Sequence, residues 1–131
     1  MLGYLTLTLR SQNRNMQIRF RFDTHDFSAV LERNPTARDL LTMMPLSLLI
    51  EDHSTNEKIA YLPTKLNERG AAPFQGEAAG DLCYYAPWGT LVFYYDRYRF
   101  FPGLIRVGRL NGGIQPLLSR GKFPLAAELI T

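Results

Sequence analysis

The residues MQIRFRF, at positions 16–22, are the best guide to the fold class of this 131-residue chain. Apolar side chains stand at every second position of this stretch, and Gln17, Arg19 and Arg21 stand between them. Successive side chains of a β-strand point to opposite faces, so this period of two predicts a strand with one apolar and one cationic face. It is the clearest strand signal in the chain, and it favours a β-rich domain.

Similar strand signals lie on both sides of residues 16–22. Upstream, three leucines alternate with two threonines over residues 5–9, which predicts a half-buried strand. Downstream, short apolar or alternating stretches predict six more strands over residues 27–31, 46–50, 59–62, 81–86, 90–95 and 104–110. About eight strands in one chain need a way to satisfy their edges, and a closed β-barrel does so economically.

One main α-helix is predicted after the third of these strands. Asn34 can cap a helix, and Pro35 suits its first position. Apolar residues follow at the spacing i, i+3, i+4 and i+7 from Ala37 to Met44, which is typical of a helix with one buried face. Pro45 then ends it. The sequence therefore predicts a mainly β protein with a single substantial helix.

Residues 63–79 show no period of either kind and are punctuated by glycine and proline. We interpret them as a long loop, and loops of this length in compact domains often have a function. Residues 87–89, Pro-Trp-Gly, read as the turn of an aromatic hairpin formed by the strands on either side. These two irregular segments are the first places to look for a site.

Length and composition indicate one domain over residues 1–131. Apolar residues make up 46% of the chain and aromatic residues 12%, which is enough for a globular core. The net charge of +3 is spread along the chain rather than massed in one segment. Nucleic-acid binding is not favoured, because it usually requires a denser cationic surface with aromatic residues among the cations.

Cys83 is the only cysteine, so neither an intrachain disulfide nor a cysteine-based metal site can form. We expect it to be a small buried strand residue, and we expect the protein to be cytoplasmic. The apolar run near the N-terminus is interrupted by threonines and lacks a basic segment before it, unlike a secretory signal. No stretch approaches the ~20 apolar residues that span a bilayer, so no membrane association is expected.

Four blocks together resemble a bacterial cyclophilin-like family in order and spacing: residues 34–39 (NPTARD), 61–63 (YLP), 80–89 (GDLCYYAPWG) and 104–109 (LIRVGR). The resemblance covers roughly Met16 to Leu118. It implies a cyclophilin-type β-barrel with the helix after Asn34 over one open end. The family largely lacks an assigned activity, and fold alone does not carry function. Residues 1–15 fall outside the match, as an extra strand or as sequence before a natural start at Met16.

Peptidyl-prolyl isomerase activity is one function that the resemblance raises. Active cyclophilins place an arginine, a phenylalanine with a nearby glutamine, a tryptophan and a histidine around a slot for the proline ring. Phe74, Gln75 and Arg106 are similar to part of that set, but Gln75 follows Phe74 directly instead of three residues later. The only histidines, His25 and His53, precede the aromatic hairpin and are expected in solvated turns. Isomerase activity is therefore the alternative hypothesis.

The favoured hypothesis is non-catalytic binding of a peptide or of a small apolar or anionic ligand. Aromatic side chains with polar tips suit such a site, and an arginine can anchor a carboxylate or carbonyl. The candidate binding residues are Tyr61, Phe74, Gln75, Tyr84, Trp88, Tyr95 and Arg106. No catalytic residue, cofactor or metal site is indicated, and the sequence does not specify the ligand or an oligomeric state.

Each candidate also has a structural interpretation. Aromatic residues on strands more often fill the core, and Trp88 in its turn is more simply explained by packing on its own barrel. Arg106 is expected to pair with Asp81 or Glu77.

Overall fold

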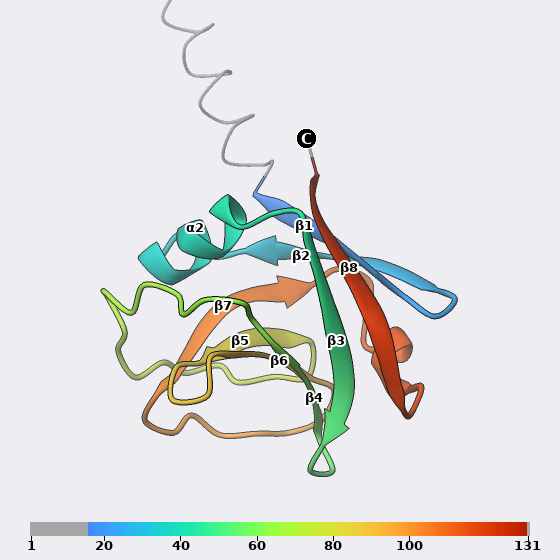
Figure 1. Ribbon diagram of the computed structural model, residues 1–131. Coiled ribbons are helices and arrows are strands. Elements are labelled where there is room, and N and C mark those ends of the chain that lie inside the picture. Colours follow the sequence, from blue (N-terminus) through green and yellow to red (C-terminus); the bar gives the residue numbers. More distant parts are fainter. Residues whose placement is uncertain (1–15, 131) are drawn as a thin grey trace, which may run out of the picture.

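A computed structural model describes residues 16–130 as a closed barrel of eight strands (Figure 1). The strands are β1 Gln17–Phe22, β2 His25–Leu31, β3 Leu46–His53, β4 Glu57–Tyr61, β5 Asp81–Tyr85, β6 Thr90–Tyr94, β7 Leu104–Leu110 and β8 Lys122–Ile130, and the helices are α2 Pro35–Thr42 and the 3-10 helix η1 Gln115–Leu118. Around the barrel the order is β1-β2-β7-β5-β6-β4-β3-β8, and all neighbours are antiparallel. The predicted mainly β barrel with one α-helix is confirmed.

The composition of the barrel differs from the prediction in one strand. The strand expected over residues 5–9 lies outside the described residues, whereas β8 was not predicted. Pro124 within β8 lacks an N–H group and Ala126 and Ala127 have low strand propensity, so local sequence does not favour a strand there. Pairing decides instead, because β8 lies between β1 and β3 and bonds to both.

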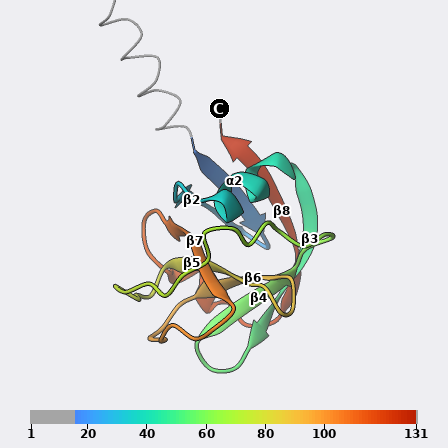
Figure 2. The ribbon, with the colours of Figure 1, turned by 90° about the vertical axis from the view of Figure 1, so that its left-hand side faces the viewer.

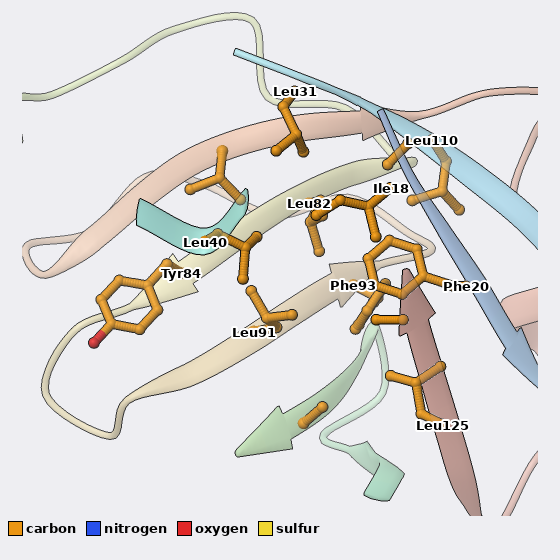
Figure 3. Close-up of a cluster of buried hydrophobic side chains, with 14 of the residues drawn as sticks. Ile18, Phe20, Leu31, Leu40, Leu82, Tyr84, Leu91, Phe93, Leu110 and Leu125 are labelled. Carbon is orange, nitrogen blue, oxygen red and sulfur yellow. The ribbon is translucent and has the colours of Figure 1, made fainter. Parts of the chain in front are cut away.

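The barrel interior holds the apolar face that the period of two predicts (Figure 3). In β1, Ile18, Phe20 and Phe22 are at most 2% exposed. Phe20 meets the Phe93 ring of β6 edge-on at 5.2 Å between centroids. The intervening Arg19 forms an ion pair with Asp26 on the neighbouring strand. The apolar and cationic faces of β1 are thus the inside and outside of the barrel.

A β-bulge in β7 changes which of its residues face inward. Opposite Leu82 and Cys83 of β5 stand Gly108 and Arg106, so β7 contains one extra residue between them. Val107 and Leu110 therefore both reach the barrel core, although strict alternation would place them on opposite faces. The sequence pattern alone did not reveal this shift.

Helix α2 covers one end of the barrel, as the resemblance implied (Figure 2). The Asn34 side chain caps it by accepting a hydrogen bond from the Ala37 N–H at 2.8 Å. The same side chain donates to the Arg106 carbonyl at 2.9 Å, which ties the start of the helix to β7. Leu40 is fully buried in the core beneath it. No helix among residues 16–130 is long and apolar enough to cross a membrane.

A second, smaller apolar cluster lies outside the barrel, on the outward faces of β4, β5, β6 and β7. Its buried members are Ile59, Cys83, Val92, Tyr94 and Leu104. Burial raises the pKa of the Cys83 thiol to about 12, as expected for a structural cysteine. The long loop was predicted over residues 63–79 and spans residues 62–80 in the structure. This loop and the segment over residues 95–103 contribute Phe74, Tyr98 and Phe100 to the cluster.

Asp81 anchors both of these irregular segments to the barrel. It is fully buried and accepts hydrogen bonds from the Ala78 N–H at 3.1 Å and the Tyr98 hydroxyl at 2.6 Å. Its other oxygen accepts from Arg109 Nε at 2.9 Å. One carboxylate thereby joins the long loop, the segment after β6 and β7.

Candidate functional site: the pocket beside Trp88

A pocket of about 240 Å³ lies on the outer face of the barrel, over β4 and β6. We call it the Trp88 pocket. The floor of the pocket follows from the alternation of side chains along β4 and β6. Ile59 of β4 and Val92 of β6 point outward and are paired in register. Glu57 opposite Tyr94 marks one end of this floor, and Thr90 opposite Tyr61 lies towards the other. The pocket therefore has an apolar centre and polar groups near both ends.

Aromatic rings form the walls of the Trp88 pocket. The Tyr85 ring meets Trp88 at 5.3 Å and Phe101 at 5.3 Å between centroids, and both pairs are steeply inclined. His53, the last residue of β3, meets the other side of Trp88 at 5.2 Å with an interplanar angle of 89°. Trp88 is 47% exposed, so its indole both packs on the protein and faces solvent.

The backbone fixes the turn that presents Trp88. Gly89 has φ +67°, a conformation that favours glycine, and its N–H bonds to the Tyr85 carbonyl at 2.9 Å. Gly103 packs so closely beneath the turn that a Cβ there would lie 2.9 Å from Pro87 Cδ. The Ala86 N–H also donates to the Gly103 carbonyl. The segment that carries Phe101 is therefore locked to the turn that carries Trp88.

Two polar side chains of the pocket have no hydrogen-bond or salt-bridge partner among residues 16–130. The Glu57 side chain is half-buried and makes no hydrogen bond or salt bridge with any residue that the structure describes. Burial raises the pKa of Glu57, and the nearby His53 opposes this shift. The Thr90 hydroxyl is buried and has no hydrogen-bond partner among residues 16–130. Each group is available to a ligand.

Three predicted binding residues form a separate cluster. The Arg106 guanidinium lies 4.7 Å from the Phe74 ring centroid, and Nη1 donates to the Gln75 carbonyl at 3.0 Å. Arg106 is also paired with Glu32 at 2.8 Å and with Asp81 at 3.5 Å, and its side chain is only 16% exposed. Its predicted structural pairing with Asp81 is present. Neither Arg106 nor Phe74 lines the Trp88 pocket.

The remaining predicted binding residues lie in other places. Tyr84 is fully buried in the barrel, and its hydroxyl accepts a hydrogen bond from the Leu66 N–H at 3.0 Å (Figure 3). Tyr95 packs against the same core. Tyr61 is 55% exposed and lines a different hollow together with Leu49 and Lys122. Of the seven candidates, the Trp88 pocket contains Trp88 alone.

Sequence reasoning missed Glu57, Thr90, Tyr85 and Phe101 as pocket residues. Alternation within β4 and β6 gives the outward positions, but the register between these strands is not readable from the sequence. His53 was expected in a solvated turn, whereas it ends β3 and packs half-buried against Trp88. The other histidine also differs from expectation, because it begins β2 and its Nε2 lies 2.6 Å from Ser119 Oγ.

Comparisons with known proteins agree with this fold. A search of curated proteins found no match. Among solved structures, the chain is similar to the hypothetical protein AF2241 from Archaeoglobus fulgidus, with a TM-score of 0.61, 13% identity, and coverage of 89% of this chain and 96% of that chain. At this identity the likeness shows the fold alone. A sequence profile of the Cyclophilin-like family matches residues 20–127, a range that contains all four blocks noted in the sequence. The chain therefore belongs to the Cyclophilin-like family.

Proposed function

We propose that this domain binds a small molecule, or one side chain of a peptide, in the Trp88 pocket without catalysing a reaction. The observation that carries the proposal is an aromatic-walled cavity over an apolar floor. Such cavities, with a few polar groups at set positions, are the usual form of small-ligand sites. The packing around Trp88 is otherwise incomplete, since about half of its indole is exposed to solvent.

The size of the cavity limits what it can hold. Its volume of about 240 Å³ is below the roughly 300–1,000 Å³ of sites for drug-sized ligands. A head group or a single side chain fits this space better than a large molecule. A longer ligand would extend past the exposed edge of Trp88.

The arrangement of the polar groups favours binding over catalysis. Nucleophilic catalysis needs a nucleophile within hydrogen-bond reach of a base. The Thr90 hydroxyl has no such partner in the described part of the chain. The His53 ring contacts Trp88 instead of a nucleophile. The nearby Cys83 thiol is buried and, with a pKa of about 12, remains protonated at neutral pH.

Prolyl isomerase activity remains the alternative. It needs a donor aimed at the amide nitrogen of the substrate, and Arg106 is the arginine that the resemblance suggests for it. Its Nε and Nη1 already bond to Glu32, to the loop carbonyls of Gln75 and Gly76, and to Asp81. We therefore expect no acceleration above the uncatalysed rate in a protease-coupled prolyl assay. A clear acceleration would favour the alternative.

The sole tryptophan gives a direct test of binding. Because Trp88 is a wall of the pocket, its fluorescence should change when the pocket fills. We would titrate three probes that share a pentyl stem: n-pentanol, n-pentylammonium and hexanoate. At least one should give a saturable change in emission and shift NMR signals of β4 and β6.

Two variants complete this test. Trp88→Ala should abolish the NMR shifts and leave the fold intact, whereas Tyr61→Ala, which removes an exposed aromatic ring elsewhere, should preserve them. If none of the three probes perturbs β4 and β6, the proposed function is wrong. A large loss of stability in Trp88→Ala would instead assign Trp88 to packing.

A further inference from the structure

We infer that the ligand of the Trp88 pocket carries an alkylammonium group, which Glu57 holds at one end of the pocket while the aromatic rings surround its stem. This inference rests on the proposed function and names its ligand class. The chemistry is shared by a lysine side chain and by a free amine with a polar group at the far end of its stem.

The first support is the unpaired charge of Glu57. Two buried or partly buried carboxylates of the barrel have cationic partners: Asp52 has Lys58 at 2.9 Å, and Asp81 has Arg109 at 2.9 Å. Glu57 has no salt bridge with any described residue, although its side chain is half-buried. A charge removed from water without a partner is costly. A cation supplied by a ligand would remove that cost.

The second support is the charge of the pocket walls. The faces of aromatic rings are negative, so they attract a cation within about 6 Å of the ring centroid. Tyr85, Trp88 and Phe101 supply three such rings. The pocket lining includes neither lysine nor arginine, so only His53 could contribute positive charge. This environment favours a cationic ligand over the anionic one that Arg106 suggested from the sequence.

The protein uses the same chemistry elsewhere. The Lys58 ammonium lies 5.9 Å from the Phe22 ring and 5.8 Å from the Phe123 ring, beside the Asp52 carboxylate. A carboxylate and two rings thus suffice to hold an ammonium group that is completely removed from solvent. The Trp88 pocket also combines a carboxylate with aromatic rings, but among residues 16–130 neither a lysine nor an arginine lines it.

Thr90 limits the shape of the ligand. Its buried, unpartnered hydroxyl needs a hydrogen bond, and leaving it unmade is unfavourable. Tyr94 stands opposite Glu57. Thr90 and Tyr94 are four residues apart on β6, which is roughly 13 Å along a strand. One ammonium group cannot reach both. The Thr90 hydroxyl therefore suits a second polar group, separated from the ammonium by an apolar stem that crosses Ile59 and Val92.

The test begins with the pentyl series, titrated against the wild-type protein by NMR shifts on β4 and β6. We expect n-pentylammonium to bind more tightly than n-pentanol, and hexanoate to bind most weakly. Equal binding of all three, or tighter binding of hexanoate, would overturn the alkylammonium inference and leave the proposed function standing. Failure of every probe would instead overturn the proposed function.

Isosteric variants then separate the two polar groups. Glu57→Gln should weaken n-pentylammonium about tenfold, the effect of losing a hydrogen bond to a charged group, without changing n-pentanol. The matched control Glu51→Gln removes a carboxylate that pairs with Lys122 outside the pocket, and it should change neither. If Glu57→Gln leaves n-pentylammonium unchanged, the assigned role of Glu57 is wrong.

Two further probes distinguish the sources of the amine. 5-Aminopentanol and Nα-acetyl-lysine amide carry the same ammonium, but the second polar group is a hydroxyl in one and amides in the other. Tighter binding of Nα-acetyl-lysine amide would indicate a peptide lysine, and tighter binding of 5-aminopentanol would indicate a free amine. Thr90→Val should remove the advantage of either probe over n-pentylammonium. An advantage that survives Thr90→Val would refute the role given to Thr90.

Discussion

The buried ion pair between Lys58 and Asp52 predicts two unequal effects when its members are removed one at a time. The Lys58 side chain is 0% exposed, and within the described part of the chain its ammonium has one carboxylate partner, at 2.9 Å. Asp52 is 18% exposed and also accepts a hydrogen bond from the Gly121 N–H at 2.7 Å. Removing Asp52 therefore leaves a buried charge alone, whereas removing Lys58 leaves a carboxylate that keeps water and a backbone donor.

These contacts set the magnitudes. Asp52→Ala should cost about 3–5 kcal/mol of unfolding free energy, the usual result of stranding one member of a buried pair. Lys58→Met loses a charged hydrogen bond worth about 1.5–3 kcal/mol, but it also removes the desolvation of Lys58. Its apolar chain still lies between Phe22 and Phe123, so we expect a net cost of about 1 kcal/mol or less.

Urea denaturation followed by circular dichroism would measure both variants, and equal m-values would show that the denatured states are comparable. The Lys122→Met substitution, at an exposed lysine, serves as the matched control and should change stability little. If Asp52→Ala and Lys58→Met cost the same within about 0.5 kcal/mol, the difference in burial does not govern the energetics of the pair.

Acidification should act like the removal of Asp52. Burial raises the pKa of the Asp52 carboxyl. The Gly121 N–H and the Lys58 ammonium together lower this pKa by more than burial raises it, so the net shift is downward. A folded-state pKa below the unfolded value gives stability that is present above the unfolded pKa of about 3.9 and is lost as the pH falls through the folded value. Lys58→Met should show a shallower loss in acid, and an unchanged profile would contradict this cause.

Three further outcomes follow from the structure. Asp81→Asn should lower the unfolding free energy by about 1.5–3 kcal/mol in urea melts, because either orientation of the new amide places an N–H against an existing donor. Thr90→Val should raise it by about 1 kcal/mol in the ligand-free protein, since the buried hydroxyl has no described partner, and a loss of stability would reveal one. Binding of n-pentylammonium should weaken as the pH falls through the raised pKa of Glu57, because protonated Glu57 has no charge to offer. The Glu57→Gln variant should lose this dependence, and a dependence that persists in that variant would contradict the role given to Glu57.

Local patterns predicted much of the barrel because its determinants are local. Alternation in residues 16–22 produces the two faces of β1, and Asn34 with Pro35 produces the start of α2. Strand β8 was not predicted, because its pairing with β1 and β3, rather than its own strand propensity, holds it extended. The bulge at Val107 was not predicted for the same reason, since it depends on the register between β7 and β5.

The candidate site was predicted only in part. Trp88 stood out because a large apolar side chain in a tight turn needs a place to pack, and that reasoning depends on a few neighbouring residues. The other residues of the Trp88 pocket come from β3, β4, β5, β6 and the segment that carries Phe101, and their proximity depends on the register between the strands. The pairing of Arg106 with Glu32 was not predicted, because these two residues are distant in sequence.

The position of β8 in the barrel determines when the barrel can close during synthesis. The barrel order places β8 between β1, the first described strand, and β3. Until the ribosome has released residues 122–130, β1 and β3 each lack one neighbour and present unpaired backbone groups. The barrel can therefore close only after residues 16–121 and then β8 have emerged, and a chaperone that shields open strand edges would act in that interval.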